Sequence, residues 1–330
     1  MKVYVLILTV YGFSLSLTGL NKFMFGVLDL KIPLLATLAN FSLVTLFLRR
    51  LYAFNGRRRP TISAAEYWKF LVPIALFTAL DVGLSNLSYS LVSISAMTVI
   101  KSTNIVVTYA VSVAFGLEVF RWRVFSACLL VLGGVCVATA QGMEIKRFRG
   151  VIFLVGAVFS LSMRWVLVHR LTRDFEALDL VFLTLPISAI FILPVAFYVE
   201  LWPLVAAADA GQLVTVRGSS VLALMLLCTS TLALALMYFE YLLVRRTSSL
   251  TLCVAGIGKE VVALLLSGLV FADHLSLRQW AAVSVSLLGI YLFSRVHRVH
   301  GKHAAAKTNV STFRPSPTLT LSHLDILPFE

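Results

Sequence analysis

Residues 242–268 read LLVRRTSSLTLCVAGIGKEVVALLLSG, in which two arginines precede a long apolar run with Lys259 and Glu260 near its middle. A stretch of about 20 mainly apolar residues is long enough to cross the hydrocarbon core of a bilayer as a helix. Basic residues next to such a run are typical of its cytosolic end. The stretch therefore predicts a transmembrane helix that starts in the cytosol and carries charge inside the membrane.

The whole chain shares this composition. Of its 330 residues, 59% are hydrophobic and 13% are charged, whereas soluble domains are about 45–50% apolar and about 25% charged. The net charge of +13 lies in short clusters between apolar runs, which excludes an ordinary soluble enzyme, a disordered chain and a nucleic-acid-binding module. The six His and four Cys show no catalytic or metal-ligand spacing, so we expect no enzymatic activity, no metal site and no cofactor.

Ten apolar runs predict an all-α polytopic membrane protein with ten transmembrane helices. With the N-terminus in the cytosol, 18 Lys and Arg lie on the cytosolic side and 6 on the other, so both termini are expected to be cytosolic. Residues 297–330 are rich in Ser, Thr, Pro and His, and we expect a disordered cytosolic tail there. The predicted spans are roughly 3–26, 32–48, 70–91, 92–115, 123–141, 150–170, 179–201, 219–242, 248–271 and 279–296.

A weak internal repeat divides the membrane region into halves. Lys101 and Lys259 lie 158 residues apart in similar apolar sequence, and each is followed 21 residues later by Trp. Five spans per half is an odd number, so the second half must insert upside down, as in the inverted repeats of many secondary transporters. We therefore predict a first five-helix repeat at 1–141 and a second at 142–296; the alternative is chance similarity between apolar helices.

Seven ionisable side chains fall within the predicted spans, where a charge costs about 2.5–3.5 kcal/mol at a helix centre. They are expected to face a water-filled cavity, to pair with one another, or both. Lys22 and Glu240 lie near span ends and can snorkel to water, so Lys22 is a weaker candidate for anion binding. Arg164 is expected to bind a phosphate or to pair with a carboxylate, either Glu240 or Asp81. The seven are Lys22, Asp81, Lys101, Arg164, Glu240, Lys259 and Glu260.

Lys101 and Lys259 are the strongest candidates for a binding site, because both lie near mid-bilayer in helices that enter from opposite sides. Two ammonium groups at this depth can hold a phosphate or diphosphate, with Asp81 and Glu260 as counter-charges in the empty site. A permanent salt bridge that locks the helices together is the structural alternative.

Small and aromatic residues near these charges are further candidates. Gly256 and Gly258 precede Lys259 and would let a ligand approach the backbone closely; the alternative is close helix packing by small residues. Three tyrosines could stack on a base or ring, although aromatic residues at helix ends are more often interface anchors. They are Tyr89, Tyr238 and Tyr241.

Two stretches, residues 242–268 and the run ALDVGLSNLSYSLVSISAMTVIKST at 79–103, resemble the triose-phosphate/nucleotide-sugar transporter family of the drug/metabolite transporter superfamily. Asn21-Lys22 resembles the family's Asn-Lys at the end of the first span, and Ser162-Met163-Arg164-Trp165 resembles its sixth span. Within the family, the chain is most similar to the GDP-fucose-transporter-like subgroup of solute carrier family 35. The resemblance covers about residues 3–296 and implies ten helices in an inverted five-plus-five repeat.

The resemblance also implies an antiporter in a Golgi or endoplasmic reticulum membrane that exchanges a nucleotide sugar, or a sugar phosphate, for a phosphate-bearing counter-substrate. Two departures narrow this expectation. Glu260 stands where plastid members place a second cation, which disfavours a small doubly charged phosphate. Residues 255–259 read Ala-Gly-Ile-Gly-Lys where GDP-mannose carriers read Gly-Ala-Leu-Asn-Lys, so guanine recognition of that kind does not carry over.

The sequence leaves two other functions open. A proton-coupled drug or metabolite exporter would use Asp81 or Glu260 as its proton carrier, and a non-transporting membrane scaffold or regulator would use the midplane charges as static locks. The expected partners are an anionic small-molecule substrate, its counter-substrate and the lipid bilayer, without nucleic acid. A homodimer is compatible with the sequence but not required by it.

Overall fold

The computed structural model describes residues 2–24, 32–56, 60–88, 91–92, 94–139, 148–203, 205, 219–270, 281 and 284–295. All regular elements in these ranges are helical. The elements are α1 (Val3–Lys22), α2 (Pro33–Phe54), α3 (Ala64–Glu66), η2 (Tyr67–Leu71), α4 (Val72–Ser88), α5 (Ile94–Ser102), α6 (Asn104–Ala114), α7 (Trp122–Thr139), α8 (Phe148–Leu171), α9 (Ala177–Ala196), η3 (Phe197–Leu201), α11 (Ser219–Arg246) and α12 (Ser249–Val270). Residues 284–295 form a further helical stretch.

Each predicted span coincides with a helical segment. Seven helices in the described ranges are long and apolar enough to cross a membrane, and two shorter apolar helices lie at Trp122–Val137 and Ser249–Lys259. The chain is therefore an all-α, multi-pass membrane protein. Inside lipid a chain must satisfy its backbone hydrogen bonds internally, and an apolar helix of this length does so within itself.

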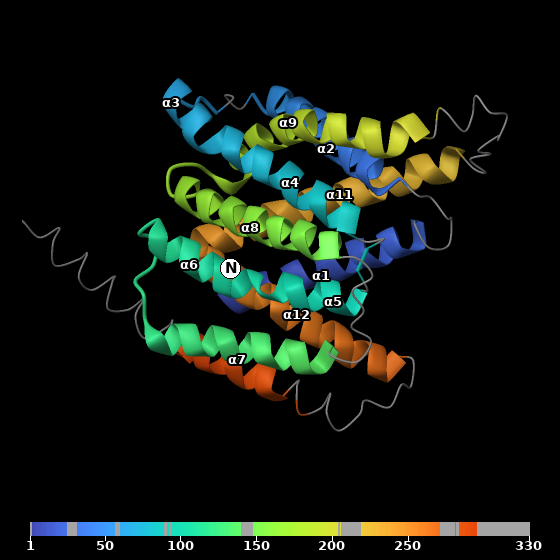
Figure 1. Cartoon of the computed structure of the whole chain (residues 1–330). Coiled ribbons are helices and arrows are strands. Elements are labelled where there is room, and N and C mark those ends of the chain that lie inside the picture. Colours follow the sequence, from blue (N-terminus) through green and yellow to red (C-terminus); the bar gives the residue numbers. More distant parts are fainter. Residues whose placement is uncertain are drawn as a thin grey trace, which may run out of the picture.

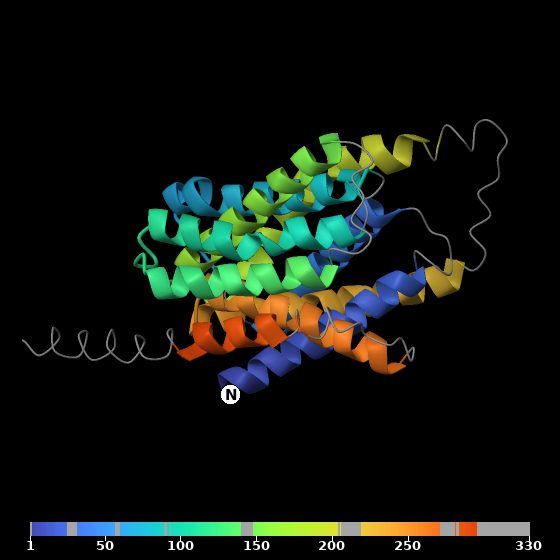
Figure 2. The same cartoon turned by 60° about the horizontal axis from the view of Figure 1, so that its bottom comes forward.

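The helices form a single bundle in which segments far apart in sequence pack side by side (Figure 1). α4 packs most extensively against α8, and further contacts join α1 to α11, α2 to α9, and α4 to α9. The start of α1 and the end of helical residues 284–295 lie at the same end of the bundle, as do the connections 115–121 and 172–176 (Figures 1 and 2). This arrangement requires an even number of crossings between the two ends of the bundle.

The fourth predicted span is interrupted, which the sequence pattern did not predict. α5 ends at Ser102 and α6 begins at Asn104, so the helical hydrogen bonding is interrupted at Thr103, two residues after Lys101, although Thr103 keeps helical φ and ψ. The hydroxyl of Ser102 donates to Thr98 O at 2.7 Å, and the hydroxyl of Thr103 donates to Ile100 O at 2.6 Å. Hydroxyl side chains that bond backbone carbonyls in this way weaken and bend helices. The break therefore lies beside a predicted site residue.

The N-terminus of α2 is satisfied by a side chain from a distant helix. Glu200 in η3 accepts hydrogen bonds from the backbone N–H groups of Leu34 and Leu35, each at 2.8 Å. The first N–H groups of a helix have no partner within the helix and are costly to leave unpaired in an apolar environment. Glu200 thus joins the seventh span to the second, a role that the sequence pattern alone did not reveal.

Candidate functional site

Asp81, Lys101 and Arg164 each lie on the face of their helix that packs against protein. Residues three or four positions apart share one face of a helix. On each side of each charged residue, at least one neighbour at this spacing is buried, while the charged side chains themselves are half-buried. These neighbours are Thr78, Ser85, Met97, Ile105, Ser160 and Val168. The three side chains therefore point into the bundle and not toward the lipid.

Arg164 lies at the centre of the group. Its guanidinium acts electrostatically on the carboxylate of Asp81, as does Lys101, and it acts in the same way on the carboxylate of Glu240, as does Lys259. Each carboxylate is thus within electrostatic reach of Arg164 and of one lysine, and the five charges come from α4, α5, α8, α11 and α12.

These charges are neighbours without being locked together. In the part of the chain that the structure describes, no N–O contact of 4.0 Å or less joins Arg164 to Asp81 or Glu240, whereas the exposed pair Arg170–Asp174 at the end of α8 is 3.1 Å apart. The Arg164 guanidinium lies 4.4 Å from the centre of the Trp165 ring, and its buried Nε has no hydrogen-bond partner among the described residues. Arg164 therefore retains a donor that a ligand can use.

Lys259 and the glycine before it contact α1. The Lys259 ammonium donates to Ser14 Oγ at 3.1 Å. The hydroxyl of Tyr11 lies where a Cβ on Gly258 would be, so this glycine makes room for a tyrosine of α1. Gly256 is exposed, and a Cβ there would meet nothing within 4 Å. The structure thus favours close packing over ligand approach as the reason for Gly258.

Two expectations about individual residues were wrong. Glu240 was expected to snorkel from the end of its span, but it lies within the charged group, because α11 continues as far as Arg246 and places Glu240 more than a turn from the helix end. Tyr241 was expected to be an interface anchor, but it is 1% exposed and packs edge-on against Trp165 with ring centres 6.0 Å apart.

Three predicted site residues stay untested by the structure. Tyr89 lies outside the described residues, as do the side chains of Lys22 and Glu260. Their assignments remain predictions.

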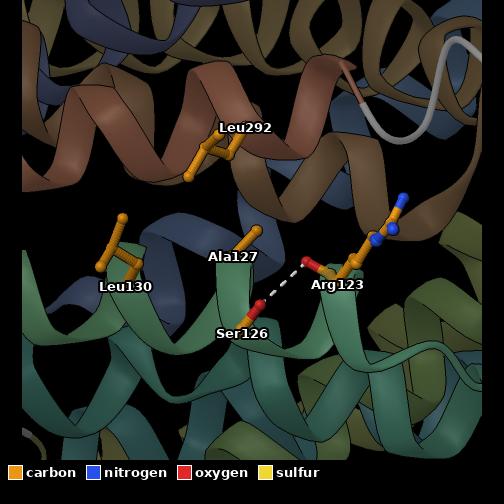
Figure 3. A pocket seen from close by; sticks show the side chains of 5 residues that line it. All are labelled: Arg123, Ser126, Ala127, Leu130 and Leu292. Carbon is orange, nitrogen blue, oxygen red and sulfur yellow. Dashed lines mark hydrogen bonds between the residues drawn. The ribbon is translucent and has the colours of Figure 1, made fainter.

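A surface hollow of about 290 Å³ lies away from the charged group. Its lining comes from α7 and from helical residues 284–295, and the Ser126 hydroxyl donates to the carbonyl of Arg123 at 3.2 Å (Figure 3). The other lining residues are Ala127, Leu130 and Leu292. The hollow contains none of the residues predicted to bind substrate.

A bundle of apolar helices that carries charges on its inward faces is the architecture of a multi-pass membrane solute transporter. The chain belongs to the Triose-phosphate Transporter family, whose pattern matches residues 1–294. This is a family of transporters and not of enzymes.

Several relatives are similar over most of the chain. A probable sugar phosphate/phosphate translocator of Arabidopsis thaliana is 27% identical over 89% of this chain and 73% of its own length. UDP-galactose transporter 1 of the same plant is 22% identical over 89% of this chain and 86% of its own length. A solved crystal structure shares the fold with a TM-score of 0.63 at 15% identity, covering 90% of this chain and 96% of that one.

Proposed function

We propose that this protein is an antiporter that exchanges a nucleotide sugar or a sugar phosphate for a phosphate-bearing counter-substrate. Lys101, Arg164 and Lys259 neutralise the phosphates of the cargo, and Asp81 and Glu240 hold these cations in place when the site is empty. The observation that carries the proposal is the environment of Arg164, which acts electrostatically on two carboxylates, forms a direct salt bridge with neither, and keeps a buried Nε without a partner among the described residues.

The charge balance favours an anion as the cargo. Among the described side chains the group contains three cations and two carboxylates, so a bound anion compensates this excess of positive charge in an environment where an unpaired charge is costly. Arginine also forms paired hydrogen bonds with phosphate oxygens, which gives the site a preference for phosphate over other anions. The names of the relatives, a sugar phosphate/phosphate translocator and a UDP-galactose transporter, describe cargo of this chemistry.

The contacts between helices support an inverted five-plus-five repeat. If each helix is replaced by the helix five spans away, the pair α4–α8 becomes the pair α11–α1, and the pair α4–α9 becomes the pair α11–α2. All four of these helix pairs are in contact. The pairs α2–α9 and α6–α12 convert into themselves and are also in contact.

The repeat relates the charges as well. Lys101 and Lys259 are equivalent under it, and Asp81 falls within one residue of the position equivalent to Glu240. Each half thus contributes one carboxylate and one lysine to the group around Arg164. Two similar half-sites facing each other are what alternating access around a fixed midplane site requires.

The proposed location is a Golgi or endoplasmic reticulum membrane with both termini in the cytosol. The orientation is supported by the excess of Lys and Arg in the connections on that side. The location is supported by the nucleotide-sugar transporters among the relatives.

A thermal-shift screen of the purified protein tests the proposal. UDP-galactose, GDP-mannose, triose phosphate and inorganic phosphate are each added, and we expect at least one of them to raise the Tm, because a ligand that binds the folded state stabilises it. Stabilisation only by neutral or cationic compounds, together with transport driven by a pH gradient, would support a proton-coupled exporter. Stabilisation by no solute at all would support a scaffold.

A further inference from the structure

Helices α8 and α12, which carry Arg164 and Lys259, meet at one half-buried asparagine that follows the helix of Lys101 in the sequence. Asn104 is the first residue of α6 and follows the break after Lys101. Its Oδ1 accepts a hydrogen bond from Ser162 on α8 at 2.7 Å, and its Nδ2 donates to Cys253 Sγ on α12 at 3.4 Å. Arg164 is on the same helix as Ser162, and Lys259 is on the same helix as Cys253.

The bonds around Asn104 form a closed ring. Asn104 Nδ2 donates to Cys253 Sγ, which donates to Thr108 Oγ1 at 3.4 Å, and Thr108 in turn donates to Asn104 Oδ1 at 3.0 Å. Thr108 and Ser162 are both 0% exposed, and Cys253 is 6% exposed. In such a ring every group gives and receives a hydrogen bond, and the bonds reinforce one another in a low-dielectric interior.

This ring lies next to the charged group. Lys101 is three residues before Asn104, and because Thr103 between them keeps helical φ and ψ, the two residues lie on the same side of the helix. Arg164 is two residues after Ser162 and lies close enough to Cys253 to act on it electrostatically. A change in the ring is consequently felt within one or two helical turns by each cation.

We propose that Asn104 is a positioning residue, which fixes the separations of Lys101, Arg164 and Lys259 so that one phosphate-bearing ligand can contact them together. The inference rests on the proposed function. A site works only when its contact groups are held in place by supporting hydrogen bonds, and the break at Thr103 leaves Lys101 on a half-helix that needs such support. The amide of Asn104 accepts two hydrogen bonds at Oδ1 and donates a third from Nδ2, a combination of separate acceptor and donor atoms that only the longer Gln shares.

A second half-buried asparagine provides a matched control. Asn40 on α2 accepts hydrogen bonds from Thr229 at 3.0 Å and from Ser230 at 2.8 Å, both on α11. Its two hydroxyl donors are buried like those of Asn104. Asn40 joins helices through Oδ1 in the same way, but on α2, which carries none of the three cations.

Two measurements on Asn104→Ala and Asn40→Ala test the inference. The first is the Kd for UDP-galactose, GDP-mannose, triose phosphate and inorganic phosphate. We expect Asn104→Ala to raise the Kd about tenfold for the compound that binds wild type most tightly, which corresponds to about 1.4 kcal/mol. Asn40→Ala is expected to leave this Kd within about twofold while lowering the Tm to a similar extent.

The second measurement needs no ligand. Spin labels replace Lys101 and Lys259 through Lys101→Cys and Lys259→Cys, with Cys136 and Cys228 changed to Ser. We expect the distance distribution between the labels to broaden with Asn104→Ala and to stay unchanged with Asn40→Ala. If wild type binds none of the four compounds but the distances broaden as expected, the proposed function fails and the positioning role stands. If neither the distances nor the Kd distinguish the two variants, the positioning role is wrong.

Discussion

Arg164 acts electrostatically on two carboxylates and has a buried Nε that no described residue bonds. A permanent salt bridge would leave an arginine with its nitrogens paired to one carboxylate at short distance. The observed arrangement instead suits a residue whose preferred partner arrives and leaves. At the scale of one side chain, this is the difference between a structural lock and a binding site.

Replacing Arg164 is therefore expected to reduce binding more than stability. Arg164→Lys keeps the charge but removes the planar fork that binds phosphate oxygens in pairs, so we expect the Kd of the best-binding compound to rise at least about tenfold. Arg170→Lys, at the exposed end of the same helix, is expected to leave the Kd unchanged. Equal effects of both substitutions in a radioligand binding assay would contradict the assignment.

The two carboxylates are expected to act in the opposite direction on binding. Asp81→Asn removes a counter-charge with which the ligand competes, so we expect the Kd to fall about threefold to tenfold and exchange to become slower, because the ligand leaves less readily. Glu240→Gln is expected to do the same, since Glu240 has the equivalent place beside Arg164 and Lys259. Weaker binding in both variants, measured by equilibrium binding with purified protein, would show that the carboxylates are not counter-charges.

At the scale of helices, substitution can distinguish the packing roles of the two glycines that precede Lys259. Gly258→Ala places a methyl group against the Tyr11 hydroxyl, whereas Gly256→Ala meets nothing within 4 Å. Both changes gain the same helix propensity, so the difference between them reports the clash. We expect Gly258→Ala to be less stable than Gly256→Ala by about 1 kcal/mol, and Tyr11→Phe to restore most of this loss. Equal Tm values for the two single variants would contradict the packing role.

The end of α6 depends on one residue with a positive φ. Gly116 has φ of 67°, its N–H bonds Val113 O at 3.0 Å, and the next N–H, of Leu117, bonds Ser112 O at 2.9 Å. This pattern is the Schellman motif that ends many helices. We expect Gly116→Ala to destabilise the protein by about 1–2 kcal/mol in thermal unfolding, whereas Gly133→Ala, inside α7 with open space around it, should not. An unchanged Tm for Gly116→Ala would show that the motif contributes nothing.

The positions of the helices along the chain could be predicted from the sequence, but the break at Thr103 and the surroundings of Glu240 could not. Apolar runs of about 20 residues are set by bilayer thickness, so each predicted span coincides with a helical segment. The break at Thr103 depends on whether hydroxyls bond the backbone or a neighbouring helix, and an apolar count contains no such information. The position of Glu240 was mistaken because distance from a helix end says nothing about which face a residue occupies. The inward orientation of Asp81, Lys101 and Arg164 could be predicted because a charge inside lipid must turn inward, whereas their role in binding stays a prediction.

At the scale of the whole molecule, the helix contacts of one half of the chain have counterparts five spans away in the other half. This symmetry suggests two halves that rock against each other around the charged group. In the proposed exchange mechanism, the carrier reorients readily when loaded and slowly when its cations are held only by their own carboxylates. Exchange of one phosphate-bearing solute for another is then faster than net transport.

Uptake into proteoliposomes measures this difference directly. Vesicles that contain the protein are preloaded with a nucleoside monophosphate, with inorganic phosphate or with buffer alone, and uptake of labelled UDP-galactose, or of labelled triose phosphate, is followed. We predict that preloading with one of the two phosphate compounds accelerates uptake of one of the labelled solutes, and that Lys101→Ala and Lys259→Ala each abolish the uptake although the variants fold. Equal uptake by preloaded and empty vesicles, or normal uptake by both lysine variants, would contradict the exchange of anions at this site.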